Sequence, residues 1–146
     1  MIKTITWKDI LPIWQTQLWP DRIAPIETNS AMCYLNGHNM FNMTTLPTFF
    51  GYIIEGKIVG VNSGHPCEDN YRSRGLWVDP SYRHQGIGRS LLKATIDRGL
   101  IEGFTMVWSY PRRTSWTTYK SAEFKLSSNW QGSETSEANA YCYFKL

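Results

Sequence analysis

The sequence predicts a mixed α/β (α+β) fold, with a central, mostly antiparallel sheet and helices on its faces. Hairpin signals concentrate in the first half of the chain, where predicted strands alternate with short turns. A strand, a glycine-rich loop and an amphipathic helix then follow one another, and two strands close the chain. With 146 residues, 42% of them hydrophobic and 18% charged, we expect one globular domain over residues 1–146.

The first 20 residues are expected to form a strand and a helix. Residues 2–7 alternate apolar and polar side chains, as a half-buried strand does. Thr6 or Asp9 can cap a helix that runs to Leu18. Pro12 is compatible with this helix only in the first turn, because proline has no N–H to donate in a helix interior.

The middle of the chain divides into a loop-rich segment and a group of strands. Residues 27–30 can cap a short helix through Leu35, and residues 38–43 show no period and are expected to form a loop. Three strands then follow, at residues 49–55, 58–63 and 73–78, with turns at residues 56–57 and 66–70.

The second half is predicted to contain two helices and three further strands. Leu91, Leu92, Ile96 and Leu100 share one face of a helix over residues 88–100. The remaining elements are a strand at 105–108, a helix at 114–121 with a weak pattern, and closing strands at 124–130 and 138–144 around a turn at 132–137.

Composition narrows the class of protein. The net charge of +3 indicates a mild preference for anionic ligands. Aromatic residues make up 14% of the chain, with seven Trp and eight Tyr, which fits a large core, a ligand groove, or both. The three cysteines are scattered, and neither Cys-x-x-Cys nor Cys/His ligand spacing occurs, so we expect no metal site and a reducing cytosol.

The stretch from Val78 to Leu92 combines a strand end, a glycine-rich basic loop and a helix start. Glycines allow backbone N–H groups to approach a ligand, and a helix N-terminus adds unpaired donors and partial positive charge. Leu91 occupies the position where a dinucleotide-binding loop has its third glycine, and no Gly-Lys-Ser/Thr follows. The loop therefore predicts an anion site of another kind.

This stretch resembles motif A of the GCN5-related N-acetyltransferase (GNAT) superfamily, whose loop runs Arg/Gln-x-x-Gly-x-Gly/Ala. Arg83, Gly86 and Gly88 occupy its three defining positions. The match extends over about fifteen residues, and the order of the predicted elements agrees with the GNAT fold along nearly the whole chain. The resemblance implies a GNAT-like sheet with helices on both faces and a splayed strand pair that holds the cofactor.

The resemblance also implies acetyl-CoA as co-substrate and a set of residues that bind it. Backbone N–H groups across the loop would hold the CoA pyrophosphate, and the preceding strand would pair with the pantetheine arm and aim the thioester at an oxyanion-stabilising N–H. The side chains of Arg83 and Arg89 can reach phosphates. The implied cofactor-binding residues are Leu76, Trp77, Val78, Arg83, His84, Gln85, Gly86, Ile87, Gly88 and Arg89.

A second, partial match lies near the C-terminus. Many family members carry Tyr-x-x-x-Gly-Phe there, and this chain keeps Tyr119 and Phe124 at that spacing while Glu123 replaces the glycine. The family's tyrosine often protonates the departing CoA thiolate. The resemblance therefore makes Tyr119 the candidate general acid.

The general base of the family is missing from its usual place. Acetyl transfer needs a neutral amine, and several members place Glu or His where this chain has Arg72 and Arg74. Arginine cannot act as a base. Three alternatives follow: the base lies elsewhere, the acceptor amine has a low pKa, or the two arginines bind a carboxylate or phosphate of the acceptor.

His65 is the best replacement base, because hairpin pairing about residues 69–70 would set it opposite Arg74 and its ordinary pKa suits proton transfer. Glu27 and Glu55 are further candidates without positional support. Four aromatic residues lie where GNAT proteins build the acceptor site and would favour an acceptor with an apolar part: Trp14, Trp19, Tyr34 and Phe41.

Three functional hypotheses follow. The first is an acetyl-CoA-dependent N-acetyltransferase that acts on a primary amine of a small molecule or peptide by direct transfer, since no cysteine has a nucleophile context. The second is a weak or inactive GNAT-like module that binds CoA or acyl-CoA. Nucleic-acid binding rests on composition alone. We expect a cytoplasmic protein without nucleic-acid partners. No apolar stretch reaches membrane-spanning length, so we also expect no membrane partner. The sequence is compatible with either a monomer or a homodimer.

Overall fold

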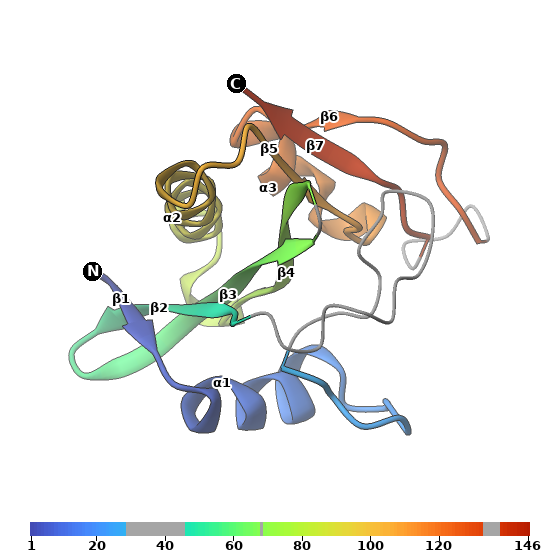
Figure 1. The fold of residues 1–146 in the computed structure, drawn as a ribbon. Helices are drawn as coiled ribbons and strands as arrows, with labels where there is room; N and C mark the ends of the chain where they lie inside the picture. The colour runs from blue at the N-terminus through green and yellow to red at the C-terminus, as the bar shows by residue number, and fades with distance from the viewer. Residues whose placement is uncertain (29–45, 68, 133–137) are drawn as a thin grey trace.

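The computed structural model describes residues 1–28, 46–67, 69–132 and 138–146, and a seven-stranded sheet organises them (Figure 1). The strand order is β1-β2-β3-β4-β5-β7-β6. The strands are β1 (Ile2–Ile5), β2 (Thr48–Ile54), β3 (Lys57–Cys67), β4 (Asn70–Val78), β5 (Met106–Ser109), β6 (Lys125–Leu126) and β7 (Cys142–Lys145). The helices are α1 (Trp7–Ile13), η1 (Trp14–Leu18), η2 (Pro80–Tyr82), α2 (Ile87–Ile101), η3 (Arg113–Ser115) and α3 (Trp116–Ser121).

Helices cover both faces of the sheet, as predicted (Figure 1). Neighbouring residues of a strand point to opposite faces, and β2 shows this with Phe49 and Phe50. Phe49 packs with Ile10 and Trp14 of α1 and η1, whereas Phe50 packs with Leu91 of α2. The two apolar faces of the sheet therefore have separate helical covers.

The first helix is capped as the sequence predicts, but its proline lies deeper than expected. The Thr6 side chain accepts a hydrogen bond from the Asp9 N–H, and the Asp9 carboxylate accepts one from the Thr6 N–H, forming a capping box. Pro12 lies inside α1 rather than in its first turn. The helix continues as the π-helix η1, at whose end the Trp19 N–H donates to the Trp14 carbonyl at 2.8 Å.

The turn of the first hairpin lies one residue earlier than predicted. Ile54 pairs with Lys57, so the turn consists of Glu55 and Gly56 rather than Gly56 and Lys57. Both turn residues have positive φ, 49° and 78°. This is the combination that a type I′ turn requires to match the twist of the flanking strands.

The β3–β4 hairpin is longer than predicted and its register differs. Both strands extend past the expected turn until Cys67 pairs with Asn70. As a consequence His65 pairs with Arg72, and the predicted pairing with Arg74 is wrong. The tighter turn shifts every cross-strand neighbour, because register follows from turn length.

Strand β4 contains a bulge at the point where it leaves β5. Val61 pairs with Trp77 while Ser63 pairs with Arg74, so two residues of β4 oppose one residue of β3. Gly75 provides the positive φ of 79° in this bulge. Its carbonyl accepts a hydrogen bond of 2.9 Å from Trp14 Nε1. The bulge and the indole together fix the bend of the strand.

Strands β4 and β5 separate directly after their shared start. They are parallel and pair only at Tyr71 with Val107 and Arg72 with Trp108, although β4 continues to Val78. All other neighbouring strands in the described sheet are antiparallel. The predicted splayed strand pair is thus confirmed, and the gap exposes backbone along the second half of β4.

Replacing Gly75 with alanine is expected to destabilise the protein by about 2–4 kcal/mol. A side chain at positive φ costs about 1–2 kcal/mol, and the new methyl group would collide with the ring of Trp14. Chemical denaturation measures the change. Gly103→Ala is the matched control, because Gly103 has a φ of 92° with open space around it and should cost only the backbone term. Equal losses for both variants would contradict a role of the Trp14 contact.

The C-terminal strands are shorter than predicted. Instead of strands at 124–130 and 138–144, the structure has β6 and β7, with isolated bridges at Asn139. The Ser128 hydroxyl accepts a hydrogen bond from the Tyr141 N–H and so replaces a strand–strand bond there. The predicted turn at 132–137, the short helix through Leu35 and the loop at 38–43 lie mainly or wholly outside the described residues.

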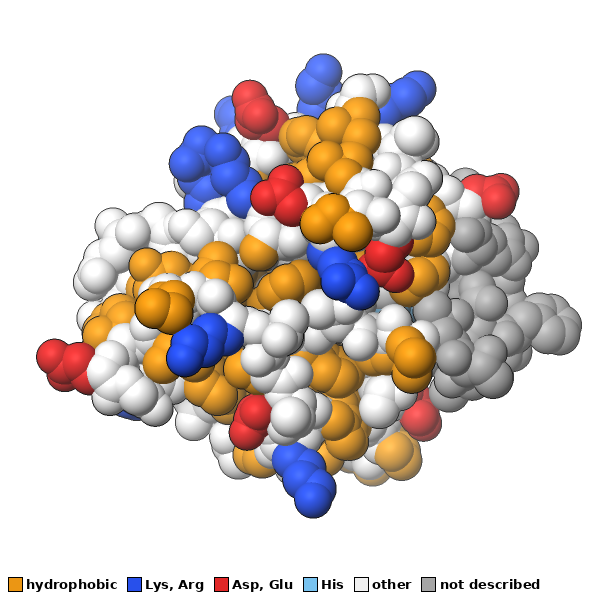
Figure 2. Space-filling model, turned by 60° about the vertical axis from the view of Figure 1, so that its left-hand side comes forward, with side chains coloured by type: hydrophobic (Ala, Val, Ile, Leu, Met, Phe, Trp, Pro, Cys, Tyr) orange, Lys and Arg blue, Asp and Glu red, His pale blue; other side chains and the backbone are white. Residues whose placement is uncertain are grey.

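The surface carries mixed charge. Lys and Arg side chains are interspersed with Asp and Glu on the face in Figure 2, between patches of apolar side chains. That face therefore lacks the continuous basic stripe that is typical of nucleic-acid-binding proteins. None of the described helices has the length and apolar character needed to cross a membrane.

Candidate active site

Two adjoining cavities lie beside the free half of β4. The first, which we call the loop groove, has a volume of about 590 Å³ and runs between β4, the loop before α2, and the η3–α3 segment. The second, the arginine cavity, has about 470 Å³ and lies between β4, β5 and the residues after η1. The cavities share four lining residues: Leu18, Leu76, Arg112 and Ser115.

The loop groove brings together most of the residues predicted to bind the cofactor. Seven of the ten line it: Leu76, Trp77, Val78, Arg83, His84, Ile87 and Gly88. Gln85, Gly86 and Arg89 belong to the same loop and helix start but do not line the groove. Motif and strand predictions therefore converge on one surface.

The opposite wall of the groove was not predicted. It consists mainly of hydroxyl side chains of η3 and α3: Thr114, Ser115, Thr117, Thr118 and Ser121. In the sequence, this Thr and Ser content only weakened the helix prediction. The high Thr and Ser content of residues 114–121 was the sequence signal that could have indicated a polar wall opposite the glycine-rich loop.

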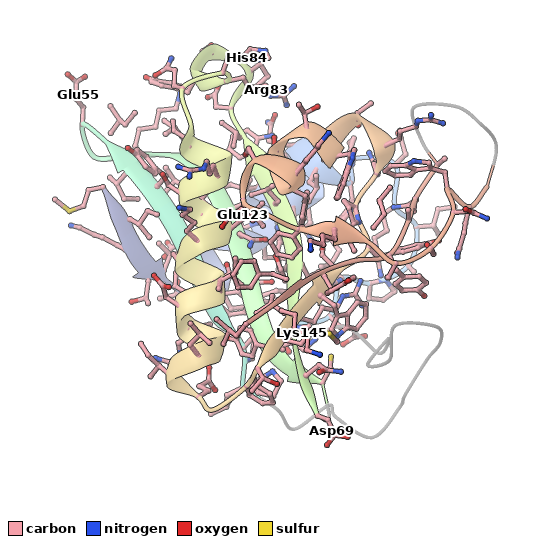
Figure 3. The ribbon with its side chains drawn as sticks, turned by 90° about the horizontal axis from the view of Figure 1, so that it is seen from above. Glu55, Asp69, Arg83, His84, Glu123 and Lys145 are labelled. Carbon is pink, nitrogen blue, oxygen red and sulfur yellow. The ribbon has the colours of Figure 1, made fainter. Side chains whose placement is uncertain are left out.

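A set of short hydrogen bonds fixes the loop before α2. Asp79 caps η2 by accepting from the Ser81 N–H at 2.9 Å, and this bond lowers the pKa of the Asp79 carboxyl. Arg83 Nε donates to the Val78 carbonyl at 3.0 Å. His84 follows with a positive φ of 62°, which turns the chain toward the start of α2, where Arg83 and His84 lie side by side (Figure 3).

The start of α2 is open to a ligand. Gly86 is its N-cap, with a φ of 80° and no side-chain cap, so the first N–H groups of the helix have no intrahelical acceptor. The Cα of Gly88 faces α3 closely, since an added Cβ would lie 2.7 Å from the Thr118 methyl. Arg89 Nε donates to the Ser121 carbonyl at 3.0 Å and ties the two helices together. Backbone donors at a helix N-terminus without a side-chain cap fit a pyrophosphate.

Tyr119 lines the arginine cavity from α3 and is buried. Its hydroxyl lies 3.3 Å from the Ser109 hydroxyl, which also donates to the Ser73 carbonyl at 2.8 Å. Burial raises the pKa of Tyr119, so the phenol keeps its proton through the physiological range. A buried, protonated hydroxyl beside β4 can donate a proton to a developing anion.

The turn after Tyr119 keeps the geometry of the family pattern without its glycine. Glu123 has a positive φ of 69°, a conformation that glycine adopts without steric cost. The Phe124 N–H donates to the Tyr119 carbonyl, and the two rings pack edge to face with centroids 5.3 Å apart. Phe124 therefore holds Tyr119 in position even though Glu123 departs from the pattern.

The three candidate bases occupy different environments. His65 is fully buried on β3 and lines neither cavity, and burial together with the charges of Arg72 and Arg74 lowers its pKa well below the ordinary value. Glu27 lines the arginine cavity. Glu55 is exposed at the β2–β3 turn (Figure 3) and lines neither cavity. Among the described residues, His, Cys, Asp and Glu form no group of three that could hold a metal ion.

Arg72 and Arg74 line the arginine cavity and are buried. Arg72 stacks on Trp108, with 4.6 Å from its Cζ to the ring centroid. Of the predicted acceptor-site aromatics, Trp19 lines the cavity and Trp14 lies behind it under Arg74. Tyr34 and Phe41 lie outside the described residues.

Comparisons with known proteins agree with this geometry. A model of the acetyltransferase (GNAT) family matches residues 7–124. The fold is similar to that of the ribosomal-protein-S18-alanine N-acetyltransferase from Escherichia coli, with 18% identity over 99% of this chain and 92% of that chain and a TM-score of 0.67. No curated protein sequence matches the chain.

Two further solved structures share the fold. The ribosomal-protein-alanine N-acetyltransferase from Brucella melitensis is 16% identical over 100% of this chain and 99% of that chain, with a TM-score of 0.67. The paia N-acetyltransferase from Thermoplasma acidophilum, solved in complex with coenzyme A, is 18% identical over 68% of this chain and 61% of that chain, with a TM-score of 0.57. At these identities the likeness concerns the fold.

Proposed function

The chain belongs to the acetyltransferase (GNAT) family, and on this premise we propose that it is a cytoplasmic N-acetyltransferase. It transfers an acetyl group from acetyl-CoA to a primary amine of a small molecule or peptide, directly and within a ternary complex. The proposal takes residues 1–146 as one catalytic domain.

The observation that carries the proposal is the meeting of two cavities at the splayed strands. The loop groove and the arginine cavity share Leu76, at the point where β4 has left β5. A donor in the groove and an acceptor in the cavity would meet there, and Tyr119 lines the cavity at that place. Such an arrangement converts a bimolecular reaction into one between positioned groups.

The loop groove supplies the donor site in this proposal. Backbone N–H groups from His84 to Arg89 bind the pyrophosphate, and the guanidinium groups of Arg83 and Arg89 retain further donors for the phosphates. On the edge of β4 that β5 has left, the backbone of Leu76, Trp77 and Val78 pairs with the pantetheine arm. An N–H of this strand then stabilises the negative charge that develops on the thioester oxygen.

Tyr119 is the general acid of the proposed reaction. The acceptor nitrogen forms a bond to the carbonyl carbon of the thioester, the carbon–sulfur bond breaks, and the leaving thiolate takes the phenolic proton. Burial keeps Tyr119 protonated until the thiolate forms, but the raised pKa also makes the phenol a weaker acid, so the transfer depends on close placement of the phenol and the thiolate. The amine proton leaves to a base or to solvent.

Binding of acetyl-CoA is the first test, and isothermal titration calorimetry measures it. We expect saturable binding, and no heat at millimolar co-substrate would contradict the proposal. Thiol release over a panel of amines then separates an enzyme from a module that only binds CoA or acyl-CoA. Turnover above background hydrolysis with any amine excludes the pure binder.

The base is tested by the pH dependence of turnover. Because the pKa of His65 is lowered, its imidazole is already neutral near pH 7, and a further rise in kcat/KM up to about pH 9 must come from deprotonation of the acceptor amine. We therefore expect the rise to follow the amine pKa across a series of acceptors.

The role of His65 as base stays a prediction, which His65→Asn decides. A loss of about 100-fold in kcat with an unchanged melting temperature would assign the base to His65. Unchanged turnover would remove it, and Glu27→Gln is then the next variant, since Glu27 is the candidate base that lines the arginine cavity.

A further inference from the structure

The arginine cavity carries a strong positive charge. Four arginines line it against a single glutamate among the described residues, a net charge of +3: Arg22, Arg72, Arg74, Arg112 and Glu27. The whole chain has the same net charge of +3, so this one cavity accounts for the imbalance. Its volume of about 470 Å³ lies within the range of small-molecule sites.

Arg74 lies deep in this cavity and has few polar contacts. Its side chain is stacked against Trp14 and Trp19, with its Cζ 5.2 Å and 5.1 Å from the two ring centroids. One of its terminal nitrogens donates to the Glu27 carbonyl at 2.8 Å. The ion pairs among the described residues join Lys57 to Asp79 and Arg98 to Glu102, so no described carboxylate forms an ion pair with Arg74.

This arrangement leaves positive charge in a partly dry place. Burial and the charges of Arg72 and Arg22 lower the pKa of Arg74 to about 9, while the Glu27 charge opposes the shift. A buried charge is costly unless an opposite charge or several hydrogen bonds compensate it. The aromatic rings hold the guanidinium in place but do not neutralise it. An anionic ligand in the cavity would neutralise the guanidinium charge.

The position of the two arginines relative to β4 also points to the acceptor. Arg72 and Arg74 are two residues apart on the strand and so lie on the same face. Ser73, between them, points to the other face, where its hydroxyl accepts from the Asn62 side-chain amide at 2.8 Å. Both guanidinium groups therefore face the cavity that Tyr119 lines, not the groove proposed for CoA.

We propose that the acceptor amine carries an anionic group, a carboxylate or a phosphate, which Arg72 and Arg74 bind inside the arginine cavity. This inference rests on the proposed function, because it names the substrate class of the same site. Arginine forms two parallel hydrogen bonds with either group, which fixes orientation as well as affinity. The anion would then direct the amine toward the end of the loop groove.

Matched acceptors test the inference by thiol release at saturating acetyl-CoA. One set is β-alanine, β-alaninamide and O-phosphoethanolamine, and the other is phenylalanine and phenylalaninamide. We expect the charged members to exceed their amides about 100-fold or more in kcat/KM, because a site built for a polar group rejects an analogue that lacks it. Simple amine reactivity predicts the reverse, since an amide group lowers the pKa of the neighbouring amine. The kcat/KM of O-phosphoethanolamine relative to that of β-alanine shows whether the site prefers a phosphate or a carboxylate.

Arg74→Gln should remove this preference by lowering turnover of the acids while leaving that of the amides within about threefold. Arg113→Gln is the matched control, because Arg113 also stacks on a tryptophan, with its Cζ 5.5 Å from the Trp130 centroid, but lines neither cavity. The control should keep the full preference. Equal turnover of acids and amides by the unmodified protein, or an equal loss for both in Arg74→Gln, overturns the inference.

A binding measurement separates failure of this inference from failure of the proposed function. Calorimetry with 3-phenylpropionate and 3-phenylpropionamide reports on the arginine cavity without any acetyl transfer. Binding of the acid alone, abolished in Arg74→Gln, supports the anion site even if no amine is acetylated. The opposite result is that the protein binds acetyl-CoA but binds the acid and the amide equally well or not at all. This result leaves the proposed function intact and overturns the anion site.

Discussion

Replacing Gly86 with valine will lower the affinity for acetyl-CoA by about 100-fold or more while the chain stays folded. Gly86 is the N-cap of α2 and has a φ of 80°, which presents the first N–H groups of the helix to the loop groove. Valine is strongly disfavoured at such a φ, and relief of the strain would rotate these N–H groups away from the pyrophosphate. Charge-assisted bonds to several phosphate oxygens would be lost together.

Gly103→Val is the matched control for this variant. Gly103 has a φ of 92° just beyond the other end of α2, and like Gly86 it has no atom within 4 Å of an added Cβ. Both variants should lose a similar amount of stability, measured by chemical denaturation, whereas calorimetry should find the loss of affinity only in Gly86→Val. Equal affinities in the two variants would place the pyrophosphate elsewhere.

Local signals predicted that most residues of the loop before α2 share one groove with the end of β4. The loop before α2 is a contiguous stretch whose glycine spacing, strand end and helix start are all visible in the chain. Its proposed function depends on backbone N–H groups, and the backbone conformation follows from the local residues. The structure places Arg83, His84, Ile87 and Gly88 on one groove for this reason.

The sequence could not predict the features that depend on contacts between distant residues. The hairpin turn after Cys67 is tighter than expected, which shifted His65 from Arg74 to Arg72. The bulge at Gly75 depends on an indole that comes from η1, some 60 residues earlier. No local pattern reports either feature, so the sequence could not show that His65, its best candidate base, is buried outside both cavities.

The acceptor side illustrates the same limit. Arg72 and Arg74 depart from the family pattern, but the sequence cannot distinguish exposed strand arginines from buried ones. Their burial results from Trp14, Trp19 and Trp108, which reach them from η1, the residue after it and β5. Only the folded chain brings these rings and charges together.

Tyr119→Phe will lower kcat for acetyl transfer by about 100- to 1,000-fold and leave the affinity for acetyl-CoA nearly unchanged. The phenol lines the arginine cavity rather than the loop groove, so its loss removes a proton donor and no donor-site contact. The raised pKa of Tyr119 adds a second expectation. The phenol stays protonated up to about pH 9, so its deprotonation should cause no loss of activity in that range.

Tyr71→Phe is the control that separates chemistry from stability. Tyr71 is also fully buried with a raised pKa, but it packs in the core under α2 and lines neither cavity. Each variant removes one buried hydroxyl and should cost about 1 kcal/mol of stability, whereas only Tyr119→Phe should lose turnover. An acetyl donor with a better leaving group, such as an acetyl thioester of a more acidic thiol, should recover part of the lost rate. Equal turnover in the two variants would contradict a role of Tyr119 as general acid. The CoA thiolate would then leave without the phenolic proton and take its proton from solvent.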